Sequence, residues 1–291
     1  MKIRALQLLA VSWLAGSALA CAESVEAARI QYLFKSWDGP TLRVFATRPA
    51  GLAADRPVVF VMHGKGRNAD EYRDQWHELA EQHGFLLLVP EFSEADFPGP
   101  ESYNLGNVFD EDGNTNPRSE WSYSAIEKIF DDARSRFGLS VGNYSIYGHS
   151  AGAQFVHRYI FHVPEARVDQ IVAANAGWYT MPDFSVAFPY GLQGAVVGRS
   201  DIEKSLALPV TILLGDQDTD PNHSSLRRSP EAMEQGEHRY ARGFAFFKMA
   251  SVLAVGLKTP FNWQMGIVEG ADHDNRLMAP AAIPFLLAGP Q

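Results

Sequence analysis

The chain has 291 residues, of which 46% are hydrophobic and 20% charged, and its formal net charge is −9. This length and hydrophobic content suffice for a large buried core, and no Pro-, Gly- or Ser-rich linker divides the chain. The acidic balance argues against nucleic acid as a partner, because phosphate binding needs a surplus of Lys and Arg. The only cysteine is Cys21, which excludes an intramolecular disulfide.

The first twenty residues have the pattern of a secretory signal peptide. Lys2 and Arg4 precede a short apolar run, and Ala18-Leu19-Ala20 forms a small-x-small cleavage site. Because the run is too short to span a bilayer, we expect no membrane span. We expect cleavage near Ala20, a secreted or periplasmic protein, and a single domain over residues 21–291. A lipid anchor on Cys21 is the alternative that we do not favour.

Strand patterns alternate with helix patterns along the rest of the chain. Residues 41–48 alternate between apolar and polar and predict an edge strand, whereas later apolar runs are continuous, as in strands buried on both faces. Those runs cover residues 57–64, 84–91, 144–149, 170–177, 210–216 and 263–270. Helical spacing occurs at residues 70–84, 119–138, 150–162, 239–256 and 275–289. This order predicts an α/β fold with a mostly parallel central sheet flanked by helices on both faces.

Two long irregular segments, residues 92–118 and 178–206, each follow a predicted strand. Loops at the carboxyl ends of strands hold the substrate contacts of many α/β proteins. Aromatic side chains in such loops can stack on a substrate, so we take Trp178, Tyr179 and Tyr190 as candidate substrate contacts.

Ser150 lies where a predicted strand meets a predicted helix, in the sequence Gly-His-Ser-Ala-Gly. A serine at such a turn has a strained backbone, and the tight reversal leaves no room for side chains two positions away on either side. Gly148 and Gly152 occupy those two positions. The pattern is that of the G-x-S-x-G nucleophile elbow, which exposes a serine hydroxyl.

A nucleophilic serine needs a histidine to accept its proton and a carboxylate to orient that histidine. Asp216, Asp218 and Asp220 follow the predicted strand at 210–216, and His273 follows the last strand. We favour Asp218 as the acid because Gly215 to Asp218 has the Gly-x-x-Asp spacing. Ser150, Asp218 and His273 then form the predicted catalytic triad.

An oxyanion that forms on the substrate needs two backbone donors. The N–H of Ala151, directly after the serine, is one, and we assign the other to the N–H of Lys65 in the Gly-rich turn His63-Gly64-Lys65-Gly66. A phosphate-binding loop is the rival interpretation of this turn, but the spacing of a P-loop is absent. The chemistry requires no metal and no cofactor, and we predict none.

The motifs HGKGRN, YGHSAGAQ, GDQD and GADHD together resemble those of the α/β-hydrolase superfamily over nearly the whole predicted mature chain. Within it, the chain is similar to secreted serine esterases of the polyhydroxybutyrate depolymerase and feruloyl esterase type. The chain also resembles poly(aspartic acid) hydrolases, which are themselves similar to polyester depolymerases. The chain departs from the first group in having Ala151-Gly152-Ala153 after the nucleophile and in lacking disulfides.

The residues and the resemblance together imply a secreted serine hydrolase that cleaves a small-molecule or polymeric carboxylic ester through an acyl-enzyme. Two alternatives remain open at this point. One is hydrolysis of the amide bonds of a polyamide such as poly(aspartic acid), for which Lys65, Arg67, Arg199 and Lys204 are available as cations. The other is acyl transfer to an alcohol, because the same triad serves each of these reactions.

Overall fold

The computed structural model describes residues 27–289. The predicted signal peptide, its cleavage site and Cys21 lie outside the described residues.

An eight-stranded sheet forms the centre of the molecule, in the order β1-β2-β4-β3-β5-β6-β7-β8. β1 and β2 pair antiparallel, as do β2 and β4, and every other neighbouring pair is parallel. The strands are β1 (Ala28–Phe34), β2 (Leu42–Arg48), β3 (Val58–Met62), β4 (Leu86–Glu91), β5 (Tyr144–His149), β6 (Val168–Ala174), β7 (Val210–Gly215) and β8 (Gln264–Val268). The predicted mostly parallel sheet is confirmed.

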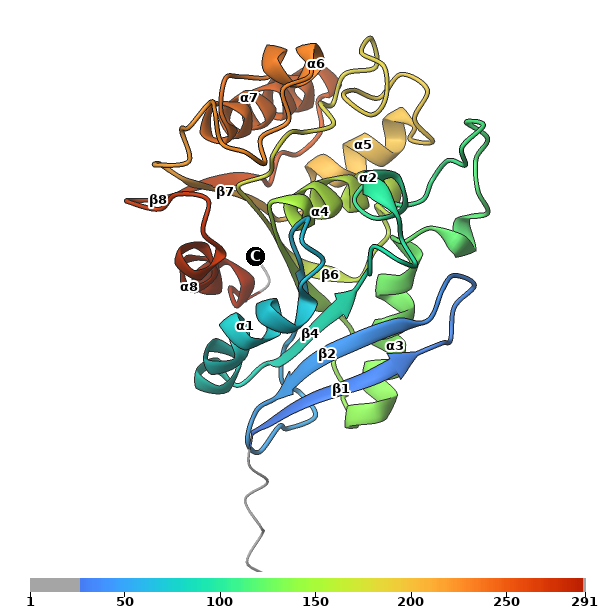
Figure 1. Ribbon diagram of the computed structural model, residues 1–291, viewed down its shortest axis with the longest axis vertical. Helices are drawn as coiled ribbons and strands as arrows, with labels where there is room; N and C mark the ends of the chain where they lie inside the picture. Colours follow the sequence, from blue (N-terminus) through green and yellow to red (C-terminus); the bar gives the residue numbers. More distant parts are fainter. Residues whose placement is uncertain (1–26, 290–291) are drawn as a thin grey trace, which may run out of the picture.

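Helices cover both faces of this sheet (Figure 1). The helices are α1 (Ala69–His83), α2 (Gly99–Ser102), α3 (Ser124–Phe137), α4 (Ala151–His162), α5 (Arg199–Leu206), α6 (Pro230–Glu234), α7 (Arg239–Leu257) and α8 (Asn275–Leu286), with a 3-10 turn η1 at Arg118–Glu120. Buried side chains of α1 and α8 form one core cluster, and those of α3, α4, α5 and α7 belong to a second.

The continuous apolar runs of the sequence follow from this double coverage. In β3, Val58, Phe60 and Met62 belong to one core cluster, whereas Val59 and Val61 belong to the other. Successive side chains of a strand point to opposite faces, so a strand covered on both sides needs an apolar residue at every position.

The structure differs from the prediction at both edges of the sheet. Residues 41–48 contain β2, which is not at the edge because β1 lies outside it. The half-exposed alternating pattern of β1 is too weak to predict a strand from the sequence. β8, predicted to be buried on both faces, is the opposite edge strand, and Ile267 is 46% exposed. Within the predicted irregular segment 178–206, residues 199–206 form α5, whose eight residues are too few for a clear helical period.

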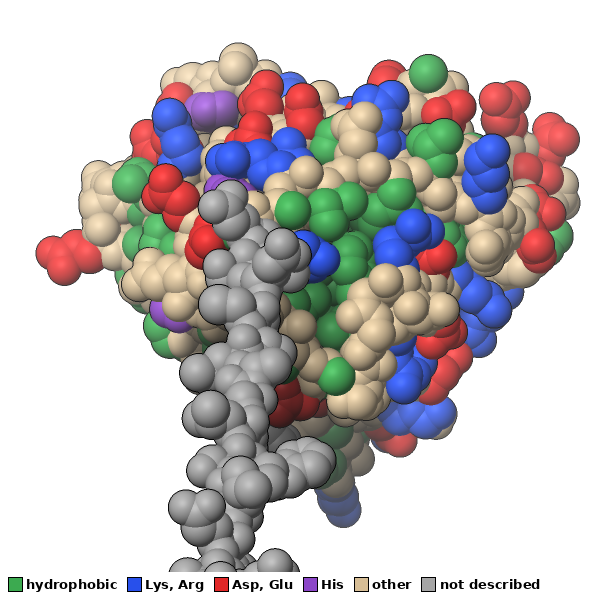
Figure 2. Space-filling model, turned by 90° about the horizontal axis from the view of Figure 1, so that it is seen from below, with side chains coloured by type: hydrophobic (Ala, Val, Ile, Leu, Met, Phe, Trp, Pro, Cys, Tyr) green, Lys and Arg blue, Asp and Glu red, His purple; other side chains and the backbone are tan. Residues whose placement is uncertain are grey.

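Charge on the surface is mixed in sign. Seen from below the view of Figure 1, Lys and Arg side chains lie beside Asp and Glu side chains around a central group of hydrophobic ones (Figure 2). On this face, the net negative charge of the chain is therefore not gathered into one acidic region.

Candidate active site

The backbone reverses sharply at Ser150, between β5 and α4. Ser150 has φ 58° and ψ −114°, a conformation that side-chain-bearing residues rarely adopt. A Cβ atom on Gly148 would lie 2.2 Å from the carbonyl oxygen of Gly152, and one on Gly152 would lie 2.0 Å from that of Met62. Both glycines are therefore required by the close approach of backbone to backbone.

Replacing Gly152 with alanine is expected to lower the free energy of unfolding by about 3 kcal/mol, because the added methyl group would overlap the β3 backbone and force β3 and α4 apart. Urea unfolding followed by circular dichroism measures this. Gly142→Ala is the matched control, since nothing lies within 4 Å of the corresponding Cβ position. Equal stability of the two variants would contradict the packing argument.

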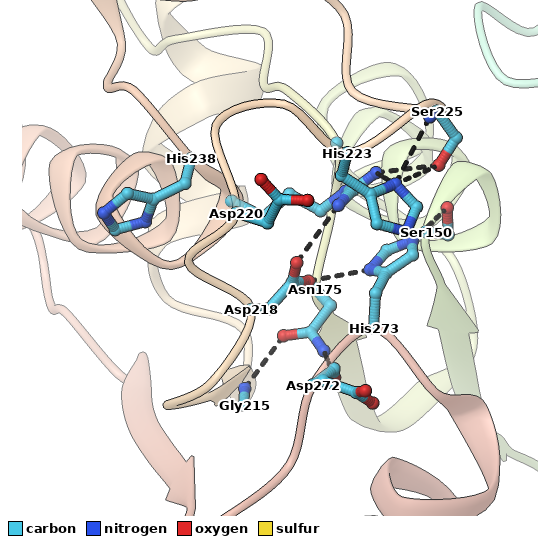
Figure 3. A network of polar contacts seen from close by, with 12 residues as sticks. Ser150, Asn175, Gly215, Asp218, Asp220, His223, Ser225, His238, Asp272 and His273 are labelled. Carbon is cyan, nitrogen blue, oxygen red and sulfur yellow. Dashed lines mark hydrogen bonds and ion pairs between the residues drawn. The ribbon is translucent and has the colours of Figure 1, made fainter.

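Ser150, His273 and Asp218 form one chain of hydrogen bonds (Figure 3). Nε2 of His273 lies 3.0 Å from Oγ of Ser150, and Nδ1 of His273 lies 2.7 Å from Oδ2 of Asp218. With Nδ1 protonated and donating to the carboxylate, Nε2 is left to accept the serine proton. Asp216 and Asp220 lie on the same loop, but their carboxylates accept from Gly270 N–H and Asn222 N–H respectively.

The two loops that carry Asp218 and His273 are bound to each other. Asn175, at the end of β6, accepts from the N–H of Gly215 at 2.9 Å and donates to the carbonyl of Asp272 at 3.0 Å. The N–H of Gln217 donates to the carbonyl of Ala271 at 2.9 Å. These bonds fix the acid relative to the histidine.

The electrostatics of the site favour a neutral histidine and an ionised aspartate at neutral pH. Burial lowers the pKa of His273 below its usual value, an effect that Arg239 reinforces and the hydrogen bond to Asp218 opposes. Burial alone would raise the pKa of Asp218, but the hydrogen bonds and charges of His273 and Arg239 outweigh it, so that this pKa is lowered. His273 is therefore ready to accept a proton.

The backbone N–H groups of Lys65 and Ala151 lie beside Ser150. Both residues line the same cavity as Ser150, and neither N–H donates to a protein group among the hydrogen bonds of residues 27–289. A Cβ atom on Gly64 would lie 3.9 Å from Cβ of Ser150, which shows how closely the loop after β3 approaches the serine. Both N–H groups therefore lack a protein acceptor in the described part of the chain, and their role as oxyanion donors stays a prediction.

His63 and Arg67 hold this loop in place. Nε2 of the buried His63 accepts from the N–H of Phe92 at 3.1 Å, and burial lowers the pKa of His63 to about 4, so the ring is neutral. Arg67 donates to the carbonyls of Phe92, Phe97 and Gly99. The loop after β3 is therefore anchored to the segment after β4.

A cavity of about 330 Å³ opens over Ser150. Of the predicted aromatic contacts, Trp178 lines it. Tyr190 lies behind Trp178, with the two ring centroids 4.7 Å apart, and is not among the lining residues. Tyr179 is fully buried, stacks on Phe246 and is not among the residues that line the cavity.

Further side chains form the cavity wall or lie directly behind it. Asn104 donates from its side chain to that of Gln154 at 2.8 Å, and this amide pair forms part of the cavity wall. Buried Arg158 lies 4.1 Å from the ring centroid of Trp178, and Arg227 lies 5.0 Å from it. No local sequence signal marks Gln154, Arg158 or Arg227, because their contacts depend on the packing of segments that are distant in the sequence.

The cavity is basic although the chain is acidic. Lys65, Arg67 and Arg227 line it, against the single carboxylate of Glu94, which pairs with Arg67. Arg199 and Lys204, the other predicted cations, lie on α5 and do not line the cavity. Within residues 27–289, no group of three or more His, Cys, Asp and Glu side chains could hold a metal ion.

Two comparisons find no relative: no protein-family model matches the sequence, and neither does any curated protein. Solved structures do match. Poly(aspartic acid) hydrolase-1 from Sphingomonas sp. KT-1 is 44% identical, with 91% of this chain and 100% of that chain covered and a TM-score of 0.89. LpqC, a poly(3-hydroxybutyrate) depolymerase from Bordetella parapertussis, is 36% identical, with 91% of each chain covered and a TM-score of 0.83.

The chain belongs to the α/β-hydrolase superfamily. More distant structures share the fold alone, among them the siderophore hydrolase EstB from Aspergillus nidulans, which is 16% identical with a TM-score of 0.54, over 97% of this chain and 99% of that chain. In this α/β-hydrolase, Ser150 follows β5, next to β3, where the strand order reverses. Ligands of open α/β sheets bind at such a switch point.

Proposed function

We propose that the protein is a secreted serine hydrolase in which Ser150 attacks a carbonyl, His273 transfers the proton and Asp218 orients the imidazole. The proposal rests above all on the continuous contact from Ser150 through His273 to Asp218, at 3.0 and 2.7 Å, next to two free backbone donors. In the first step the serine oxygen bonds to the carbonyl carbon, and His273 takes the hydroxyl proton and passes it to the leaving group. In the second step, water activated by His273 releases the acid and restores the serine.

For the substrate, we propose first a polymer that bears carboxylates, of the poly(aspartic acid) type. The basic cavity supports this choice because Lys65 and Arg227 would attract an anionic chain that the acidic remainder of the surface repels. The 44% identity to poly(aspartic acid) hydrolase-1 points the same way. The scissile bond would then be an amide.

Hydrolysis of a carboxylic ester, the reaction that the sequence favours, is the second candidate. It is supported by the 36% identity to a poly(3-hydroxybutyrate) depolymerase and by Trp178, whose ring offers an apolar wall to an uncharged chain.

A substrate panel separates the two candidates. Poly(aspartic acid), a 3-hydroxybutyrate oligomer, a feruloyl ester and p-nitrophenyl esters are incubated with the protein, and new amines and new acids are counted. Release of amines from poly(aspartic acid) alone supports the first candidate, whereas turnover of the esters alone supports the second. Failure of every substrate, together with failure of a fluorophosphonate to label Ser150, would contradict the proposed function.

A variant pair tests the role of the cavity charge. Arg227→Gln is expected to raise KM for poly(aspartic acid), with less effect on an uncharged ester, because the lost cation lies in the cavity. Lys204→Gln is the matched control, since this residue lies outside the cavity. Equal effects of both variants would remove the argument for carboxylate recognition.

The pH dependence of kcat/KM is expected to follow His273. The imidazole must be neutral to accept the serine proton, so kcat/KM rises as His273 loses its own proton. Because burial lowers the pKa of His273, the midpoint of this rise is expected below about 6.5, the ordinary value for histidine. A kinetic profile with its midpoint above that value would contradict the electrostatic picture of the site.

A further inference from the structure

Arg239, the first residue of α7, contacts the acid of the triad directly. Its buried Nη1 donates to Oδ1 of Asp218 at 3.0 Å, while the other carboxylate oxygen, Oδ2, faces His273. Asp218 thus has one hydrogen-bond partner on each oxygen, the charged guanidinium of Arg239 on Oδ1 and the imidazole of His273 on Oδ2. Sequence reasoning assigned no role to Arg239, which lies 21 residues after Asp218 in a predicted helix.

The second terminal nitrogen of Arg239 points to the segment between β7 and α6. Nη2 donates to Oγ of Ser225 at 2.8 Å and lies 3.2 Å from Nδ1 of His223. Residues 224–227 of this segment line the cavity over Ser150. One planar guanidinium therefore joins the triad acid to the wall of the substrate cavity.

The chemistry of arginine suits such a link. A guanidinium is rigid and planar, so two neighbouring N–H groups hold their partners in a fixed relative direction. Its burial would be costly without a carboxylate partner, which ties the position of Arg239 to that of Asp218. A displacement of residues 224–227 would therefore move Arg239, and Arg239 would move the Asp218 carboxylate that orients His273.

We propose that Arg239 is a positioning residue that holds Asp218 against His273 and couples this arrangement to the cavity wall at Ser225. The proposal rests on the proposed function, because it gives the triad acid a task in catalysis. Seating of a substrate against the wall would fix Arg239, and through it the direction of the Asp218 carboxylate.

Other charged and titratable groups also face His273, and they define what a pH measurement reports. The ring of His149, in β5, is tilted against that of His273 with the centroids 4.7 Å apart, and the ring of His223 lies edge-on at 5.5 Å. Asp274 directly follows His273 in the chain, precedes the first residue of α8 and forms an ion pair with Arg276. Arg239→Gln removes one positive charge from this set and leaves the others in place.

The experiment compares Arg239→Gln and Arg239→Lys with Arg242→Gln as the matched control. Arg242 is a second buried arginine on the same helix that donates to the carbonyls of Gly177 and of Arg227 in the cavity wall but not to Asp218. It therefore controls for the contact with the acid. For each folded protein, kcat and KM are measured against pH, and the titration of His273 is followed by NMR in the resting protein.

For Arg239→Gln we expect kcat to fall by at least about tenfold, as for other residues that orient a reacting group through a second one. We also expect His273 to titrate at higher pH, because a nearby positive charge has been removed. Arg239→Lys keeps the charge but cannot hold both partners in a fixed geometry, so KM should rise while the titration of His273 stays near that of the wild type. Arg242→Gln should shift the titration less than Arg239→Gln.

Several outcomes would overturn the inference. One is a folded Arg239→Gln protein with wild-type kcat and wild-type titration of His273. If Arg239→Gln does not fold, the inference is overturned when Arg239→Lys has the same kcat and KM as the wild type. A different result would overturn the proposed function: a wild-type protein that turns over no substrate and is not labelled by a fluorophosphonate. The same measurements therefore distinguish failure of the proposed function from failure of the role proposed for Arg239.

Discussion

Ser150→Ala is expected to reduce kcat by about 10⁶-fold, because the variant has no oxygen with which to form an acyl-enzyme. The fold should persist, since alanine retains the Cβ of serine and the elbow geometry depends on Gly148 and Gly152. The measurement is single-turnover and steady-state hydrolysis of the best substrate of the panel, with circular dichroism to verify folding.

Ser251→Ala is the matched control for this variant, because Ser251 is a partly exposed residue of α7 that donates to the carbonyl of Lys248 and does not line the cavity over Ser150. We expect the control to label with a fluorophosphonate as the wild type does, and Ser150→Ala not to label at all. Retention of more than about one per cent of activity by Ser150→Ala would show that another group is the nucleophile.

Asp218→Asn is expected to lower kcat by about 10⁴-fold through the tautomer of His273. Arg239 donates to Oδ1 of Asp218, so the asparagine carbonyl would take that position and its NH₂ group would face Nδ1 of His273. Nδ1 would then have to accept, and the ring proton would move to Nε2. Nε2 could no longer accept the proton of Ser150.

The other two acids of this loop provide the controls for Asp218→Asn. Asp216→Asn and Asp220→Asn keep an oxygen that can accept from the backbone N–H groups that Asp216 and Asp220 bind in the wild type. Both variants are expected to keep kcat within a few-fold of the wild type. If Asp220→Asn lost as much activity as Asp218→Asn, the assignment of the triad acid would have to be revised.

The central part of the fold could be predicted because local pattern and burial agree there. The runs at 57–64, 144–149 and 210–216 are mostly apolar, and each contains a strand in which every residue is buried. The edges could not be predicted in the same way. β1 has a weak alternating pattern, and β8 has an apolar sequence although it is half-exposed, since pairing position in a sheet depends on distant segments.

The residues of the candidate site also differ in how far the sequence predicts them. Ser150 and its two glycines lie within five residues, so local geometry constrains them together, and His273 and Asp218 follow strands in a recognisable order. Arg239, Arg158 and the Asn104–Gln154 pair have no such signal, because each meets its partners only through tertiary packing. For a related reason the sequence does not separate Tyr179 from Trp178, because composition cannot tell which of two adjacent aromatic residues faces a cavity.

The position of β8 at the edge of the sheet has a consequence for thermal inactivation. His273 follows this strand, which is held to the sheet by β7 alone and is partly exposed, whereas Ser150 follows a central strand. Edge elements open locally at lower free energy than the core around them. Detachment of β8 would withdraw the histidine from the serine while most of the hydrophobic core stayed intact. We therefore expect activity to be lost on heating at a lower temperature than that at which the hydrophobic core melts.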